Sequence, residues 1–457
     1  MVSAAGMDSG RPHCRVLIDI SHTINSGLST GIQRVVRNLA HYLPDVAADA
    51  QIECCLVVYR DGCFQLVDQQ PQGWLRDHRT LRLQFCEQLP AWYHRLVDAL
   101  CERLKLTCLR RWLLPPAGKL GVFYLPTRML CAGTKPLRWL TRGGREVQFG
   151  PGDLLLMPDG YWAVSKIWPA VAAAKRRQAK VAMILYDIIC LKHPEFFDAD
   201  STENFRSYMH QAVAHADQII AISKTVEGEL RELLDAFSTP LTAPPAITSF
   251  VLGADITHRE GEVRSELRKL FAQVQQAPYL VVSTLEPRKN HAVVLDAFDQ
   301  LWAQEPVSLL IVGRRGWMCT ELIERLISHP RFNERLFWFH DLSDAELCFC
   351  YQHARAVLCP SLAEGFGLPI VEALWYGQPT LASDIAIHRE VGGTACRYFS
   401  PNAPHQLASL IQRQQLAGEP TQPAAPPVVQ DWRSSAQQLL DIICPVSAGE
   451  SRISGGS

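Results

Sequence analysis

The chain has 457 residues, too many for one ordinary hydrophobic core, so two domains of about 200 residues each are expected. Hydrophobic residues make up 47% of it and charged residues 20%, which excludes an intrinsically disordered chain and is typical of a globular protein. The formal net charge of −1 gives no overall attraction to nucleic acid, so we expect no nucleic-acid partner.

The cysteine pattern and the N-terminal residues predict the cellular location of the protein. Fifteen cysteines are scattered without a single C-x-x-C pair, so neither a structural zinc site nor a disulfide framework is expected. The first residues (MVSAAGMDSGRPHC) lack the apolar stretch of a secretion signal, and no apolar run reaches the length of a membrane span. We therefore expect reduced thiols and a cytoplasmic location.

Short apolar runs alternate with amphipathic stretches of helical length from the N-terminus onward. Strands are predicted at 15–19, 53–59, 153–157, 181–186 and 218–222, with helices at 31–43 and 224–234. Ser223 immediately precedes the second of these helices and is its predicted N-cap. The alternation predicts βαβ units and parallel sheets, an α/β fold.

Residues 91–150 interrupt this pattern with many basic side chains, few acidic ones, and interleaved Trp and Leu residues. Such a composition suits peripheral contact with an anionic membrane at its inner face. The alternative is a solvated insertion that covers one edge of the first domain.

A stretch rich in Pro, Ser and Thr at 236–245 (AFSTPLTAPP) is the predicted hinge between the domains. Strands follow at 279–283, 308–312, 336–339, 356–359 and 380–382. We predict an N-terminal domain at 13–245, a C-terminal domain at 246–428, a C-terminal helix at 429–445 and a disordered tail at 446–457.

The most informative segment is 361–374 (SLAEGFGLPIVEAL), which follows a predicted strand and begins a helix. Open α/β sheets bind ligands at this carboxyl edge. Gly367 allows a sharp turn, and the proline that follows suits a first helical turn. The backbone N–H groups of Phe366, Gly367 and Leu368 are therefore predicted to face a diphosphate, an anion that a helix N-terminus favours.

Two carboxylates, Glu364 in the loop and Glu372 in the first turn of the helix, are predicted to face the same pocket. A carboxylate accepts two hydrogen bonds from neighbouring hydroxyl groups, which suits Glu372 for a ribose and Glu364 for a donor sugar. Taken alone, Glu372 is equally well explained as an acid that stabilises the helix dipole.

A second loop, 283–291 (STLEPRKNH), also follows a predicted strand, and it places Arg288 and Lys289 above the same sheet edge. A departing diphosphate gains negative charge, which either a metal or fixed cations must stabilise. Since no D-x-D motif is well placed for a metal, the Arg–Lys pair is the better candidate. No metal and no other cofactor are expected.

In combination, the segments 279–400 resemble the C-terminal domain of family-4 retaining glycosyltransferases, especially bacterial O-antigen and surface-polysaccharide mannosyltransferases. EGFGLPIVE resembles that family's E-x7-E motif, and EPRKNH resembles its diphosphate-binding loop. The resemblance implies the GT-B fold, in which two Rossmann-like domains with parallel sheets face each other across an interdomain cleft.

The first half resembles the family more loosely. Residues 19–34 (DISHTINSGLSTGIQR) look like its Gly-rich loop, with Gly27 and Gly31 as positions of close approach to the donor. Residues 186–195 resemble its H-D-x-x-P segment, but Tyr186 stands in place of the histidine. Asp187 is the predicted polar contact there.

The resemblance implies a retaining, metal-independent transfer of a hexose, with GDP-mannose as the first candidate donor, to a glycan or lipid-linked saccharide. Glu364 would position the donor sugar, Arg288 and Lys289 would stabilise the diphosphate, and Glu372 would hold the ribose. Two alternatives stay open: a GT-B-like epimerase or phosphorylase, and a non-catalytic protein that binds nucleotide sugars. A nicotinamide dehydrogenase is disfavoured because no G-x-G-x-x-G follows the strands at 15 or 279.

Overall fold

The computed structural model describes residues 15–26, 31–67, 145–235, 244–256, 261–274, 276–416 and 429–445. Most of the basic insertion at 91–150, most of the hinge at 236–245, the tail at 446–457 and Gly27 lie outside these ranges, and the predictions made for them stay predictions. Within the described ranges no helix is both long enough and apolar enough to cross a bilayer.

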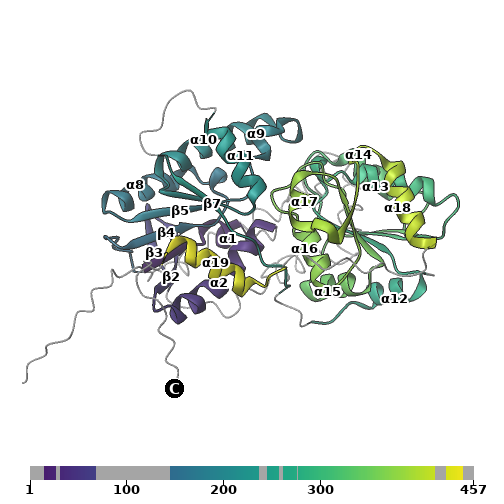
Figure 1. Ribbon diagram of the computed structural model, residues 1–457, viewed down its shortest axis with the longest axis horizontal. Helices are drawn as coiled ribbons and strands as arrows, with labels where there is room; N and C mark the ends of the chain where they lie inside the picture. The colour runs from purple at the N-terminus through teal and green to yellow at the C-terminus, as the bar shows by residue number, and fades with distance from the viewer. Residues whose placement is uncertain are drawn as a thin grey trace, which may run out of the picture.

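The described residues of the first half form a sheet with the strand order β3-β2-β1-β4-β5-β6-β7 (Figure 1). Neighbouring strands are parallel except β2 and β3, which are antiparallel. The strands are β1 (Arg15–Asp19), β2 (Glu53–Arg60), β3 (Cys63–Leu66), β4 (Asp153–Met157), β5 (Lys180–Leu185), β6 (Gln218–Ala221) and β7 (Ala246–Ser249).

Helices in this half connect the strands and cover the sheet. They are α1 (Ser21–Ser26), α2 (Gly31–Asp49), α8 (Trp168–Arg176), α9 (Ile189–Lys192), α10 (Ala199–His215) and α11 (Lys224–Asp235). The prediction that Ser223 is the N-cap of α11 is confirmed, because its Oγ accepts a hydrogen bond from the Val226 N–H at 3.1 Å.

The second half forms a fully parallel sheet with the order β10-β9-β8-β11-β12-β13. Its strands are β8 (Tyr279–Val282), β9 (Leu309–Val312), β10 (Leu336–Phe339), β11 (Ala356–Cys359), β12 (Thr380–Ser383) and β13 (Cys396–Phe399). The helices are α12 (Ser265–Gln273), α13 (His291–Leu301), α14 (Thr320–Ile327), α15 (Asp344–His353), α16 (Leu368–Trp375), α17 (Ala386–Gly392), α18 (Pro404–Leu416) and α19 (Trp432–Ile443). The predicted α/β architecture of two parallel-sheet halves is thus confirmed.

Two local features differ from the predictions. Helix α2 does not end at residue 43 but continues through Pro44 to Asp49, with Val46 and Ala47 buried. Proline removes one backbone hydrogen bond from a helix interior, and burial of the last turn compensates for that loss. The chain also contains an unpredicted antiparallel hairpin, in which Asp61 and Gly62 turn from β2 into β3 with positive φ.

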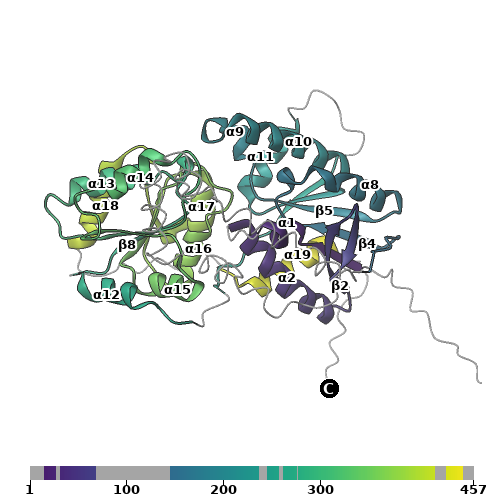
Figure 2. The same ribbon diagram turned by 180° about the vertical axis from the view of Figure 1, so that it is seen from behind.

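Strand β7 begins where the predicted second domain begins, yet it pairs with β6 in the first sheet. Helix α19 likewise returns to the first half and lies beside α2 (Figures 1 and 2). Its Trp432 is buried, and the indole Nε1–H donates to the Asp255 carbonyl at 3.0 Å. The chain therefore crosses between the halves twice.

Each sheet reverses its strand order at one point: between β1 and β4 in the first, and between β8 and β11 in the second. In open α/β sheets such a switch point opens a crevice at the carboxyl ends of the strands, where ligands bind. The two switch points are therefore the places where the fold itself favours a binding site.

Candidate active site

Glu364 is the centre of a charged cluster at the switch point of the second sheet. It lies in the loop between β11 and α16, and Ser361 Oγ donates to its Oε1 at 2.8 Å. The Lys289 ammonium donates to the same Oε1, and Arg288 Nη1 lies 3.2 Å from Oε2. The structure thus brings Glu364, Arg288 and Lys289 together from two loops that are remote in sequence.

The loop that carries the cations is a short 3-10 turn, Pro287–Lys289, after β8. Asn290 ends this turn in the left-handed conformation, and its amide donates to the carbonyls of Pro360 and Pro401 at 3.2 and 2.8 Å. The Leu362 N–H donates to the Arg288 carbonyl at 2.8 Å. These hydrogen bonds, two from the Asn290 side chain and one between backbone groups, hold the loop that carries the cations against the loop that carries Glu364.

The two glutamates of the cluster differ in the direction of their pKa shifts. Burial alone would raise the pKa of Glu364, but Lys289 and Arg288 outweigh it and hold that pKa at about 2. Arg288 also pairs with buried Glu286 at 2.7 Å, and burial raises the pKa of Glu286 against the opposing effect of Arg288. Sequence reasoning had not singled out Glu286, although it stands in the quoted EPRKNH segment.

Asp187 approaches this cluster from the first half of the chain. Its Oδ1 accepts the Ile189 N–H at 3.0 Å, and burial raises its pKa while Arg288 opposes that rise. A Cβ built on Gly365 would lie 3.1 Å from the Asp187 Cβ and 2.1 Å from the Tyr186 carbonyl oxygen. The backbones of the two halves therefore meet beside Glu364, and only glycine fits at 365.

Tyr186, in the position of the family histidine, points away from the cluster. It is buried, and its hydroxyl donates to the Pro158 carbonyl at 2.5 Å. This hydrogen bond links the chain just after β5 to the chain just after β4.

The start of α16 has the predicted backbone geometry. Gly367 is the N-cap with φ of 91°, a conformation that favours glycine, and the proline stands in the first turn. Phe366 is buried, and the N–H groups of Phe366, Gly367 and Leu368 have no acceptor among the described residues. Gly31, at the start of α2, is exposed and lies near Leu368: a Cβ there would be 3.8 Å from the Leu368 side chain.

Glu372 lies away from the cluster and already has partners on both oxygens. It stands one residue beyond the first turn of α16, in contrast to the predicted position. The Tyr351 hydroxyl donates to its Oε2 at 2.6 Å, and Arg34 of α2 donates to its Oε1 at 2.5 Å. Burial raises the pKa of Glu372, and Arg34 counteracts that rise.

Arg34 was not singled out in the sequence, although it ends the quoted Gly-rich segment. Its Nη2 is buried without a hydrogen-bond partner among the described residues. Residue Arg34 belongs to the first half and Glu372 to the second, so this ion pair also joins the two halves.

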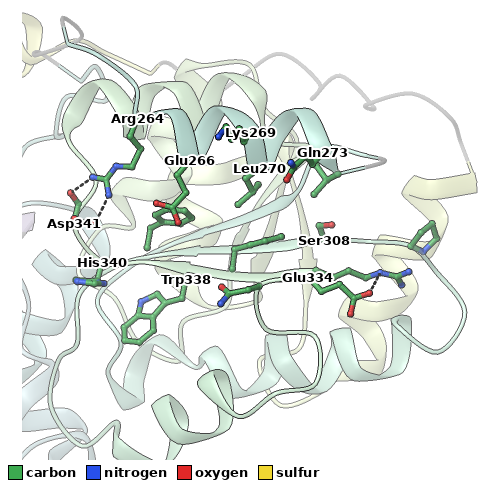
Figure 3. Close-up of a pocket in the computed structure, with 16 residues that line it drawn as sticks. Arg264, Glu266, Lys269, Leu270, Gln273, Ser308, Glu334, Trp338, His340 and Asp341 are labelled. Atoms are coloured by element: carbon green, nitrogen blue, oxygen red, sulfur yellow. Dashed lines mark hydrogen bonds and ion pairs between the residues drawn. The ribbon is translucent and has the colours of Figure 1, made fainter. Parts of the chain in front are cut away.

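A cavity of about 730 Å³ lies elsewhere, along the edge strand β10 (Figure 3). None of the predicted site residues lines it. Arg264, at one end of it, is paired with Asp341 at 2.9 Å and with Glu346 at 2.6 Å. Since none of the predicted site residues lines it, we assign no part of the candidate site to this cavity.

No three His, Cys, Asp or Glu side chains group as a metal site would require within the ranges that the structure describes. The expectation that the chain uses no metal stays a prediction.

Comparison with known proteins finds a family match in one part of the chain. Residues 263–414 match the family described as Glycosyl transferases group 1. The chain is 31% identical over 279 residues to the serotype-specific mannosyltransferase WbdA of Escherichia coli, a match that covers 58% of the chain and 34% of WbdA. It is 26% identical to the E. coli O-antigen chain mannosyltransferase B, over 51% of the chain and 61% of the relative. The chain therefore spans about a third of the length of WbdA.

Solved structures show the fold. The chain is similar to Anabaena HepE in complex with UDP and glucose, with a TM-score of 0.52 at 16% identity over 94% of this chain and 95% of that one. Sucrose-phosphate synthase from Thermosynechococcus elongatus is similar with a TM-score of 0.51 at 14% identity, and 94% of each chain is covered. The prediction of the GT-B fold is confirmed.

Proposed function

We propose that this chain, whose residues 263–414 form a glycosyltransferase group 1 domain, transfers a hexose from a nucleotide diphosphate sugar to a glycan or lipid-linked saccharide. The similarity to WbdA and to O-antigen chain mannosyltransferase B supports mannose as the hexose and surface polysaccharide synthesis as the process. GDP-mannose is the proposed donor, and the proposed reaction retains the anomeric configuration without a metal.

The observation that carries this proposal is the cluster of Glu364 with Arg288 and Lys289 at the switch point of the second sheet. The two cations contact Glu364 in the loop that leads to the unpaired N–H groups at the start of α16, and this set of donors suits a diphosphate because fixed donors stabilise negative charge as it develops. Glu364, ionised beside them, is suited to accept hydrogen bonds from the hydroxyl groups of the donor sugar.

The other proposed contacts with the donor are inferred from where each residue lies relative to this cluster. Gly31 lies beside Leu368 and allows the first domain to approach the donor closely, a role we also propose for Gly27. Asp187 contributes a polar contact from the first domain. Glu372 is proposed to hold the ribose, which requires the ribose to replace Arg34 or Tyr351 at one of its oxygens.

A thermal-shift panel with GDP, UDP, dTDP, ADP and CDP, each with and without EDTA, tests the donor and the metal. A nucleotide at about a hundred times its Kd should stabilise the protein by roughly 2.7 kcal/mol. We expect GDP to stabilise it equally with and without EDTA. Stabilisation by another nucleotide alone would replace GDP as the donor, and loss of the shift in EDTA would contradict a metal-free site.

Product analysis with GDP-mannose and a mannose-terminated acceptor separates the three functions. An extended saccharide supports transfer, a free isomerised sugar nucleotide or sugar phosphate supports an epimerase or phosphorylase, and binding without any product supports a non-catalytic protein. Transfer is the expected outcome.

The two carboxylates should respond differently to substitution. Glu364→Gln keeps the side-chain volume but removes the charge, so we expect transfer to fall at least a hundredfold while the Kd for GDP changes less than threefold. Glu372→Gln should raise the Kd for GDP about tenfold, since a hydrogen bond to a charged group is worth about 1.5–3 kcal/mol. Calorimetry and initial rates measure both effects, and an equal loss of GDP binding in both variants would show that these roles are wrongly assigned.

A further inference from the structure

The switch point of the first sheet carries a polar cluster that the proposed donor contacts do not use. Asp19 ends β1, His22 lies in α1 directly after it, and Asp159 follows β4 by two residues. Strands β1 and β4 are the neighbours between which the strand order reverses. By the rule that places the donor cluster between β8 and β11, a ligand site is expected here as well.

Asp159 holds His22 in one orientation. The carboxylate is fully buried, and its Oδ1 lies 3.2 Å from His22 Nδ1 and accepts the Gly160 N–H at 2.9 Å. Its Oδ2 accepts the Thr23 N–H at 2.6 Å. Both Asp159 oxygens already accept backbone N–H groups, so the His22 tautomer that fits this contact donates from Nδ1, and in that tautomer Nε2 carries a lone pair.

Asp19 fixes the other side of the same turn. Its Oδ1 accepts the Ser21 N–H at 3.1 Å, and its Oδ2 accepts the Tyr161 hydroxyl at 2.9 Å. Residues 21 and 23 are therefore both anchored to buried carboxylates, with His22 between them. The His22 side chain is 18% exposed, and its Nε2 has no partner among the described residues.

His22 and Asp159 lie on the side of the first domain that faces the donor cluster. The Pro158 carbonyl, one residue before Asp159, accepts the Tyr186 hydroxyl, and the Tyr186 carbonyl faces Gly365 beside Glu364. In both views α1 is on the side of the first domain that faces the second (Figures 1 and 2). A group on His22 Nε2 would thus be bound on the first domain, at the edge that meets the donor domain.

We propose that His22, oriented by Asp159, is an acceptor-binding residue whose Nε2 accepts a hydrogen bond from a hydroxyl group of the acceptor saccharide. This inference rests on the proposed function. Asp159 acts through His22 and is a positioning residue.

The test compares His22→Ala, His22→Gln and Asp159→Asn with the wild-type protein, using GDP-mannose as donor and mannobiose as acceptor probe. His22→Ala should raise the KM for mannobiose about tenfold, the loss of one neutral hydrogen bond. His22→Gln, whose amide oxygen still accepts, should recover part of this loss, and Asp159→Asn should resemble His22→Ala. The Kd for GDP and the slow hydrolysis of GDP-mannose by water should stay unchanged, because neither uses the acceptor site.

His210→Ala, at an exposed position on α10, is the matched control and should leave the KM for mannobiose, the Kd for GDP and the hydrolysis of GDP-mannose unchanged. An unchanged KM in His22→Ala overturns the proposal. So does an equal loss of GDP binding or donor hydrolysis, which would assign His22 to the donor side.

Failure of the proposed function itself looks different, because the wild-type protein would then neither bind GDP nor consume GDP-mannose. Calorimetric titration of mannobiose into wild-type protein and His22→Ala tests the saccharide site in that case. Weaker binding to the variant supports the site, and equal binding overturns it.

Discussion

At the scale of single residues, buried carboxylates in this protein differ in charge because their partners differ. Glu364 and Asp19 are both shielded from water, which by itself raises the pKa of a carboxyl group. Glu364 has two cations beside it and keeps its pKa at about 2. Asp19 has only the hydrogen bonds of Ser21 and Tyr161, so burial dominates and its pKa rises to about 7.

The raised pKa of Asp19 predicts a pH dependence of stability. Between about pH 4 and pH 7 the folded protein keeps a proton on Asp19 that the unfolded chain has lost. The free energy of unfolding should therefore fall as pH rises through this range, by at most about 4 kcal/mol from this group. Asp19→Asn cannot titrate, so urea denaturation at pH 5 and pH 7.5 should show a smaller fall for the variant than for the wild type.

The difference in pH dependence of stability between the wild type and Asp19→Asn reports on Asp19, because the other groups titrate in both proteins. His291, for example, is buried with its pKa lowered to about 3, and it opposes Asp19 by reducing stability as pH falls below about 6.5. Identical pH slopes in variant and wild type would contradict the raised pKa.

At the scale of elements, the N-terminus of helix α11 in the first domain is capped by groups of the second domain. The Glu390 carboxylate of α17 accepts the N–H groups of Lys224 and Thr225, both at 2.7 Å, at the start of α11. The Ser223 hydroxyl at the same helix start donates to the Gly365 carbonyl at 2.9 Å. An anion at a helix N-terminus satisfies free N–H groups and opposes the helix dipole, so α11 depends on the second domain for part of its stability.

Glu390→Ala is expected to lower the free energy of unfolding by about 1 kcal/mol, the usual value of an N-terminal cap. Hydrogen exchange at Lys224 and Thr225 should become faster because their N–H groups lose their acceptors. Glu232→Ala, an exposed glutamate on the same helix, is the control and should alter neither quantity. Unchanged exchange at the two amides of the Glu390 variant would show that the cap is not formed in solution.

At the scale of the whole molecule, the two domains are joined by contacts that also shape the candidate site. Arg34 reaches Glu372, Tyr186 faces Gly365, and the Trp317 indole donates to the Phe196 carbonyl at 2.7 Å. Helix α19 returns the end of the described chain to the first domain, where Arg433 pairs with Asp49 at 2.6 Å. Arg34–Glu372 and Tyr186–Gly365 therefore contribute both to domain contact and to the geometry of the candidate site.

Gly365→Ala should weaken both the contact between the domains and nucleotide binding at the candidate site. The added Cβ would lie 2.1 Å from the Tyr186 carbonyl oxygen, a backbone atom that cannot move alone, so the domains must separate or the Glu364 loop must shift. We expect a loss of about 1–3 kcal/mol in stability, as for other overpacked positions, and a weaker GDP-induced thermal shift.

Gly228→Ala provides the comparison, since a Cβ there meets nothing within 4 Å and alanine favours the helix. It should keep or slightly raise the melting temperature. Equal melting temperatures for the two variants would mean that the domains do not meet at Gly365 in solution.

Part of this fold and site could be predicted because the information is local. Strand and helix periods, a Gly–Pro helix start at 367–369 and charged residues directly after strands are patterns within a few neighbouring residues. Two of the misplaced elements have tertiary causes: α2, which packs against α19, continues past Pro44 because its last turn is buried, and β7 joins the first sheet through its pairing with β6.

The sequence by itself determined the α/β class, the two loops of the candidate site and the identity of Glu364, Arg288 and Lys289. Tertiary structure alone decided which side chains meet across the chain: His22 with Asp159, 137 residues apart, and Arg34 with Glu372, 338 residues apart. The reason is physical. Local backbone preferences fix where an element begins and ends, whereas the partner of a buried charge is fixed by how the elements pack, and no local pattern encodes that packing.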